Sequence, residues 1–295
     1  MYFNDNELAT VELEYKFIKK NINKFSDILI HINKMNYKAL IIDLSSYFDI
    51  DLLVKLNALL LNFDIEKYVK LKYNSQLDYD YLYENIIPKG FIIISEILNL
   101  KEIKKFDDSI IHQLKFYYKD YHNIKMQIFE VLENASNQNL ILDPQLLEDE
   151  NDVDFEVYRK IVNDYSTTIT NNNKVSLTSF HLPTETIRDH PCNVFLCSNK
   201  FCHSQKSNIP RYIFIDSNGE VYPFKITNPK LLIGNIIDLN FDLNRLILDY
   251  KNSINHICFL TLNEQVFKNI IQYRIPLIPW VDLLTIEVRK LYVSK

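Results

Sequence analysis

Short apolar runs alternate with helical patterns along the first third of the chain, and this alternation restricts the fold more than any other feature. Three runs fit buried strands, KALIIDL at 38–44, KYVKLKY at 67–73 and GFIIISEI at 90–97. Two segments between them, IDLLVKLNALLLNF at 50–63 and YDYLYENI at 79–86, carry apolar residues at helical spacing. Alternation of this kind is typical of βα units, so we expect an α/β fold with a parallel sheet.

Patterns on either side extend this alternation. Apolar residues recur every three to four positions from Leu13 to Met35, which predicts one or two helices. Further along, SIIHQLKFYYKDYH at 109–122 is predicted as a helix and IKMQIFEVL at 124–132 as a strand. The α/β pattern is therefore expected to begin with a helix and not with a strand.

The chain changes character near residue 175. The polar stretch STTITNNNK at 166–174 separates the βα pattern from a region of short strands and turns. We therefore predict one domain at 1–175 and a second at 176–295. In the second, PRYIFIDSNGEVYPFKI at 210–226 contains an Asn-Gly turn between two strands. Both positions of this dipeptide accept positive φ, which predicts a β-hairpin.

Glycine is scarce in this chain. Gly90, Gly219 and Gly234 are the 3 glycines present, where an average usage of about 7% predicts on the order of twenty. Phosphate-binding loops need several glycines close together so that the backbone approaches the anion. The composition thus disfavours nucleotide-loop enzymes, and the lack of a Gly-x-Ser-x-Gly sequence excludes a nucleophile elbow.

The charge and hydropathy of the chain favour a cytoplasmic protein. The net charge is -5, and lysines are interspersed with acids, so no basic stripe predicts binding to nucleic acid. No window reaches the roughly 18 apolar residues of a membrane span, and the first residues do not resemble a signal peptide. The few cysteines suit a reducing compartment.

Three of the four cysteines lie within CNVFLCSNKFCHSQ at 192–205. Cys192, Cys197, Cys202 and His203 form a candidate ligand set for zinc or an iron–sulfur cluster. The gaps between these cysteines contain four residues each, which is wide for the paired ligands of a structural zinc site. Two interpretations stay open, a metal site or thiols that pack in the core as remnants of a lost cluster.

Two short motifs follow each other in the C-terminal half. IDSNGEVYPF occupies 215–224 and IGNI occupies 233–236, with Cys202 ahead of both. Together they resemble the auxiliary-cluster region, the SPASM domain, of radical SAM peptide-modifying enzymes. The resemblance implies a partial parallel βα barrel in the first domain, followed by a small SPASM-like α+β domain that contains the hairpin.

The chain departs from this family at the residues that carry its chemistry. The resemblance implies a C-x3-C-x2-C motif after the first barrel strand, which holds a four-iron cluster that binds S-adenosylmethionine, yet no cysteine precedes Cys192. We expect the first barrel strand to be missing, because the chain starts near the helix that normally follows it. The family's G-G-E-P motif is replaced by SSYF at 45–48, and a cluster cysteine of the hairpin by Phe224.

These departures predict a catalytically degenerate radical SAM/SPASM-like protein that binds a peptide or a partner enzyme in a ribosomal peptide maturation system. No cofactor is expected on this interpretation. The binding surface is expected at the strand ends, where barrel ligands lie, and it comprises Ser45, Ser46, Tyr47, Asp49, Tyr73 and Gln76. A sheet edge left open by the missing strand would let a partner add a strand there.

Two alternatives stay open. In the first, the cysteine set, completed by His203 or Cys258, holds an iron–sulfur cluster or zinc, and the chain is an enzyme whose site a partner completes. In the second, the resemblance is accidental and the chain is an unrelated interaction module. That alternative expects no adjacent parallel strands in the first 135 residues.

Overall fold

The computed structural model describes residues 10–47, 49–73, 79–98, 109–134, 140–145, 157, 160, 164, 175–177, 212–222 and 232–251. Ten strands in these ranges form one sheet in the order β10-β9-β8-β1-β2-β3-β4-β5-β6-β7. Every neighbouring pair from β8 to β7 is parallel, whereas β9 pairs antiparallel with β8 and with β10. The strands are β1 (Thr10–Glu14), β2 (Ala39–Asp43), β3 (Glu66–Lys72), β4 (Phe91–Ile97), β5 (Ile111–Tyr117), β6 (Leu140–Gln145), β7 (Val175–Leu177), β8 (Tyr212–Ile215), β9 (Glu220–Tyr222) and β10 (Gly234–Asn235).

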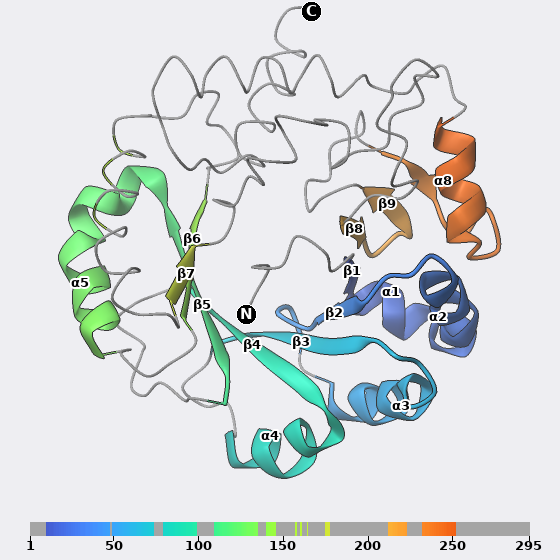
Figure 1. Ribbon diagram of the computed structural model, residues 1–295, viewed down its shortest axis with the longest axis horizontal. Coiled ribbons are helices and arrows are strands. Elements are labelled where there is room, and N and C mark those ends of the chain that lie inside the picture. Colours follow the sequence, from blue (N-terminus) through green and yellow to red (C-terminus); the bar gives the residue numbers. More distant parts are fainter. Residues whose placement is uncertain are drawn as a thin grey trace, which may run out of the picture.

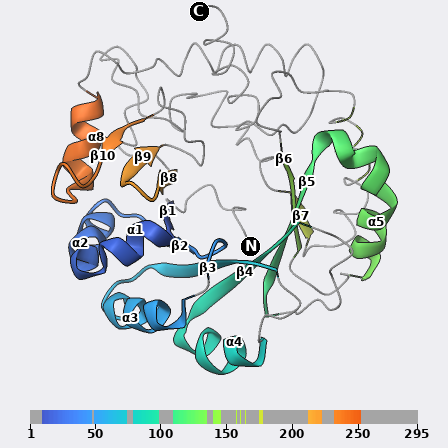
Figure 2. The same cartoon turned by 180° about the vertical axis from the view of Figure 1, so that it is seen from behind.

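Helices cover the outer side of this sheet. They are α1 (Tyr15–Lys20), α2 (Phe25–Lys34), α3 (Ile50–Leu60), α4 (Tyr79–Asn85), α5 (Tyr121–Asn134) and α8 (Leu243–Lys251), with 3-10 turns η1 (Ile22–Lys24), η2 (Ile87–Lys89) and η4 (Tyr118–Asp120). Figure 1 shows the strands following a curve with α1 to α5 along its outer side, and Figure 2 shows the same arrangement from behind. In the part of the chain described, no helix is long and apolar enough to cross a membrane.

The main hydrophobic core lies between the helices and the sheet. Alternate strand residues face it, because side chains of a strand point to opposite faces in turn. The strand contributions include Val11, Leu13, Leu40, Ile42, Val69 and Leu71, and the helix contributions include Phe25, Ile28, Leu29, Ile32, Leu52, Leu53, Leu56 and Leu60. The opposite face of the sheet carries a separate apolar cluster of Ala39, Ile41, Tyr68, Ile94 and Ile111.

The predicted alternation from 38 to 97 is confirmed. The three apolar runs form β2, β3 and β4, and the two segments between them form α3 and α4. The strands β1 to β5 are adjacent and parallel. The expectation attached to the unrelated-module alternative, that this region lacks adjacent parallel strands, is therefore wrong.

The prediction for residues 109–132 is wrong, because helix and strand are exchanged. Ile111–Tyr117 is the strand β5, in which Leu114 and Phe116 alternate with Gln113 and Lys115. The predicted strand at 124–132 lies within α5. Apolar residues at every second position of the first segment indicate a strand. Apolar residues three to four positions apart in the second segment indicate a helix.

The first strand, expected to be missing, is present as β1. It pairs with β2 on one side and with β8 on the other. The sheet edge proposed beside β2 as a docking place is therefore covered, and that expectation is wrong. Glu12 and Glu14 interrupt the apolar residues of this strand, so its pattern does not indicate a buried strand, although Glu12 is only 3% exposed.

The predicted hairpin is confirmed, and hydrogen bonds explain its sequence. One carboxylate oxygen of Asp216, Oδ1, accepts from the N–H groups of Asn218 (2.9 Å) and Glu220 (2.8 Å). The side chain of Asn235 donates to the carbonyl of Asn218 at 3.0 Å. The backbone N–H of Ser217, in the same turn, donates to Glu14 Oε2 at 2.8 Å. The hairpin thus belongs to the same sheet as β1, while the domain division at residue 175 stays a prediction.

The close packing of the hairpin turn predicts that Gly219→Ala is destabilising. Gly219 has a φ of +83°, and a Cβ there would lie 2.8 Å from Ile237 Cδ1. Gly90 is the matched control, since its φ is +80° but its nearest neighbour, Lys67 Nζ, would lie 3.6 Å away. We expect a loss of about 1 kcal/mol for Gly90→Ala and about 2–4 kcal/mol for Gly219→Ala in urea unfolding. Equal losses would show that the contact with Ile237 does not matter.

Candidate functional site

The loop after β2 lies at the carboxyl end of the parallel strands, the edge where sheets of this kind bind ligands. Its turn is held by Asp43, whose Oδ1 accepts from the backbone N–H of Ser45 at 2.9 Å and from the Ser45 hydroxyl. Ser46 is exposed. Asp49 ends the loop and caps α3, because its Oδ1 accepts from Leu52 N–H at 2.9 Å.

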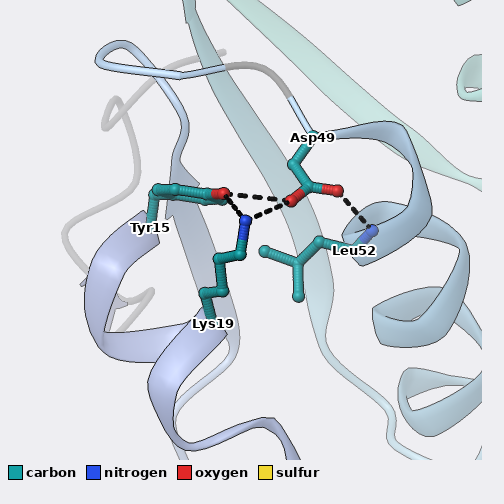
Figure 3. A network of polar contacts seen from close by, with 4 residues as sticks. All are labelled: Tyr15, Lys19, Asp49 and Leu52. Atoms are coloured by element: carbon teal, nitrogen blue, oxygen red, sulfur yellow. Dashed lines mark hydrogen bonds and ion pairs between the residues drawn. The ribbon is translucent and has the colours of Figure 1, made fainter.

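The second carboxylate oxygen of Asp49 joins this loop to α1 (Figure 3). The Tyr15 hydroxyl donates to Asp49 Oδ2 at 3.0 Å, and Lys19 Nζ lies 3.3 Å from the same oxygen. Lys19 Nζ also donates to the Tyr15 hydroxyl at 2.7 Å. Each of the three polar groups therefore contacts the other two, and the loop is fixed against the first turns of α1.

An aromatic pair completes this strand-end cluster of Tyr15, Lys19, Tyr47 and Asp49. The rings of Tyr15 and Tyr47 lie 5.3 Å apart. Lys19 Nζ lies 5.3 Å from the centroid of the Tyr15 ring and 5.6 Å from that of the Tyr47 ring. Tyr15 is buried, whereas Tyr47 is 58% exposed. The cluster therefore presents one aromatic ring and one ammonium group to solvent.

The contacts of the cluster change the proton affinities of its charged members. The hydrogen bond with Tyr15 and that with Asp49 raise the pKa of Lys19. Burial alone would raise the pKa of Asp49, but the Leu52 N–H, the Tyr15 hydroxyl and Lys19 outweigh it and lower this pKa. Lys19 and Asp49 therefore form an ion pair at neutral pH.

The strand end at β1 does not fit the four-iron cluster of the radical SAM family. β1 ends at Glu14 and α1 begins at Tyr15, with no loop between them. The side chains gathered here supply carboxylate, phenol and ammonium groups, whereas iron–sulfur clusters are held by cysteine thiolates.

A second group of charges lies on the face of the sheet that is turned away from the main core. We call it the inner ionic network, and it consists of Glu12, Lys70, Glu96 and Lys115. Lys70 Nζ lies 3.7 Å from Glu12 Oε1 and 2.9 Å from Glu96 Oε1. Lys115 Nζ lies 2.7 Å from the same Glu96 oxygen. The first three side chains are buried and Lys115 is partly exposed, so the network is closed except at Lys115.

The pairing overcomes the cost of burial for these charges. Burial alone would lower the pKa of Lys70, but the carboxylates of Glu12, Glu96 and Asp43 raise it well above its usual range. Burial alone would raise the pKa of Glu96, but Lys70 and Lys115 lower it. Lys70 and Glu96 are therefore both charged at neutral pH.

The structure places the predicted partner-binding residues in separate regions. Ser45, Ser46, Tyr47 and Asp49 lie together in the loop after β2, where Tyr15 and Lys19 join them. Tyr73 instead is buried at the end of β3, where its backbone N–H donates to the carbonyl of Glu96 at 2.6 Å.

The remaining predicted site residues, Gln76, Cys192, Cys197, Cys202 and His203, lie outside the described residues. Among the residues that are described, no group of three or more His, Cys, Asp or Glu side chains is placed to hold a metal ion. The cysteine set thus stays a prediction.

The inner ionic network was not predicted, although the sequence contains a pattern that marks it. In β1, β3 and β5, the charged residue that belongs to the network lies between two apolar residues. The three sequences are Val11-Glu12-Leu13, Val69-Lys70-Leu71 and Leu114-Lys115-Phe116. A charge at the centre of a strand whose neighbours face the core must lie on the opposite face. Charges of both signs at such positions in neighbouring strands predict ion pairs across the sheet.

Removal of the central lysine should destabilise the fold strongly. In Lys70→Met, Glu12 and Glu96 lose a buried counter-charge, and we expect the free energy of unfolding to fall by about 3–5 kcal/mol. Lys115→Met is the matched control, because water reaches this position, and we expect a loss of about 1–2 kcal/mol. Urea unfolding of both variants measures the difference. A smaller loss for Lys70→Met than for Lys115→Met would contradict this account of the network.

The lowered pKa of Glu96 predicts a dependence of stability on acid. Its contribution is present above the ordinary carboxyl pKa of 4.5 and is lost as the pH falls through the lower pKa of the folded state. The free energy of unfolding should therefore decrease between pH 6 and 3, and the decrease should be shallower in Glu96→Gln. Unfolding in urea at a series of pH values tests this, and identical pH profiles for the two proteins would refute it.

Comparisons with known proteins identify similar folds. Neither a scan against protein-family models nor a search of curated proteins gives a match. The crystal structure of Streptococcus suis SuiB matches 84% of this chain and 67% of its own, with 13% identity and a TM-score of 0.51. The structure of SuiB bound to precursor peptide SuiA matches 87% of this chain and 73% of its own, with 14% identity and a TM-score of 0.45. The mixed α/β fold of this chain, with its mostly parallel sheet, thus resembles the fold of SuiB.

Proposed function

We propose that this chain is a radical SAM-like protein that has lost the radical chemistry and binds a peptide or a partner enzyme during ribosomal peptide maturation. The observation that carries the proposal is the direct passage from β1 to α1. Glu14 is the last residue of the strand and Tyr15 the first of the helix. This passage leaves no loop for the cysteine motif that the family resemblance implies at this point.

The loop after β2 supports the same proposal. The family's G-G-E-P motif is replaced by SSYF at 45–48. Asp49, the acid nearest to this sequence, is engaged by the Leu52 N–H, the Tyr15 hydroxyl and Lys19. Polar groups that contact each other in this way have less capacity to bind a cofactor, whereas the exposed Tyr47 ring offers a contact for a protein chain.

The peptide-related part of the proposal rests on two observations. The hairpin and the IGNI segment resemble the SPASM region of peptide-modifying enzymes, and the fold resembles that of SuiB. SuiB is a protein known in a structure with a precursor peptide, SuiA. We carry peptide binding over to this chain as a proposal, with the strand-end cluster as the contact surface.

The proposal predicts that the chain does not cleave S-adenosylmethionine. The full chain is reconstituted with iron and sulfide without oxygen, reduced with dithionite and given S-adenosylmethionine, and 5′-deoxyadenosine is quantified. We expect no product above a protein-free control, because the thiolates needed at β1 are absent from the sequence. Catalytic formation of 5′-deoxyadenosine would overturn the degenerate assignment.

The iron, zinc and sulfide content of the same preparation separates the proposal from the enzyme alternative. Cys192/Cys197/Cys202→Ser is the matched variant. Near-stoichiometric metal that disappears in this variant would favour a metal-dependent function. Equal background metal in both proteins is the outcome that the proposal expects.

A further inference from the structure

Helix α1 exposes a row of lysines beside the strand-end cluster. Lys16, Lys19 and Lys20 are exposed, whereas Phe17 and Ile18 are buried in the core. Residues three and four positions apart lie on the same side of a helix, so the three ammonium groups share one face. This face is a local concentration of positive charge on a chain whose net charge is -5.

The exposed ring of Tyr47 borders this lysine face. Lys19 connects the two, because its Nζ lies 5.6 Å from the centroid of the Tyr47 ring. The hydrogen bonds from Tyr15 and Lys19 to Asp49 hold the loop and the helix together (Figure 3). The loop that carries Tyr47 and the helix that carries the lysines therefore keep a fixed relative position, and a ligand need not order these two segments on binding.

We propose that the lysine face of α1 together with Tyr47 selects an acidic peptide segment that carries an aromatic or aliphatic side chain. This inference rests on the proposed function and names the chemistry of its partner. Carboxylates of the peptide pair with Lys16 and Lys20, and an apolar side chain packs on the Tyr47 ring. Charge complementarity sets the choice of partner, because opposite potentials steer association and fix register.

The acids next to the ring favour a peptide over a nucleic acid. Asp49 borders Tyr47, and Asp51 is exposed in the first turn of α3. A continuous phosphate backbone that reaches the ring meets these carboxylates, whereas a peptide places its charges at separate positions. Three lysines are also few for the phosphate contacts on which nucleic-acid affinity depends.

The test measures the binding of three labelled peptides to the full chain by fluorescence anisotropy. The probes are an acidic peptide of about 12 residues that alternates Asp and Glu with Leu and Phe, its Asn/Gln version and its Lys version. We expect the acidic peptide to bind about tenfold more tightly than the neutral one and to weaken with added salt. Lys16→Glu/Lys20→Glu should lose this preference, while the charge-matched control Lys34→Glu/Lys55→Glu, at two other exposed positions, should keep it.

The outcomes separate this inference from the proposed function. Equal binding of the three peptides, or an unchanged preference in Lys16→Glu/Lys20→Glu, overturns the acidic selectivity and leaves peptide binding in place. Absence of binding by every peptide overturns the peptide-binding proposal itself. Tighter binding of labelled oligothymidylate than of the acidic peptide overturns the assignment to peptides in favour of a nucleic acid.

Discussion

The rest of the structure depends on the pairing of β1 with two strands at once. This five-residue strand pairs with β2 along all its residues and with β8 along four of them. It therefore joins the βα units of the first half to the hairpin of the second. Its central charge, Glu12, is tolerated on a buried face because Lys70 lies beside it and also neutralises Glu96. The two clusters of charge thus have different roles, since the inner network holds the sheet and the strand-end cluster holds a surface loop.

The contacts of the hairpin explain how a sequence that resembles the SPASM motif can form its turn without a metal. Asp216, Gly219 and Asn235 close the turn by their own hydrogen bonds and by close packing. None of these contacts requires a cluster or a thiolate. Residues that the fold itself needs can occur without the chemistry of a family, so the resemblance of this motif indicates shape more directly than activity.

The sequence alone predicted the elements whose pattern is local. The apolar runs of β2 to β4 and the Asn-Gly hairpin are determined by neighbouring residues, and the structure confirms them. The local pattern does not mark β1 in the same way, because Glu12 and Glu14 interrupt its apolar residues and the buried Glu12 is paired with Lys70, a residue of a different strand. Likewise Ser45 to Asp49 were found as a loop at a strand end, but Tyr15 was not, since its bond to Asp49 spans 34 positions. Partners that distant leave no periodic pattern in the sequence.

The bond between Ser217 and Glu14 spans 203 positions, and this separation matters while the chain is being synthesised. At about 5–20 residues per second, the ribosome needs on the order of 10–40 s to make the segment between them. Throughout this interval β1 can pair with β2, but its other edge has no strand to complete it. Such an edge is open to pairing with other chains. The nascent protein is therefore most prone to aggregation before the hairpin emerges. In truncated products that lack β8, this edge of β1 stays unpaired and the tendency to aggregate remains.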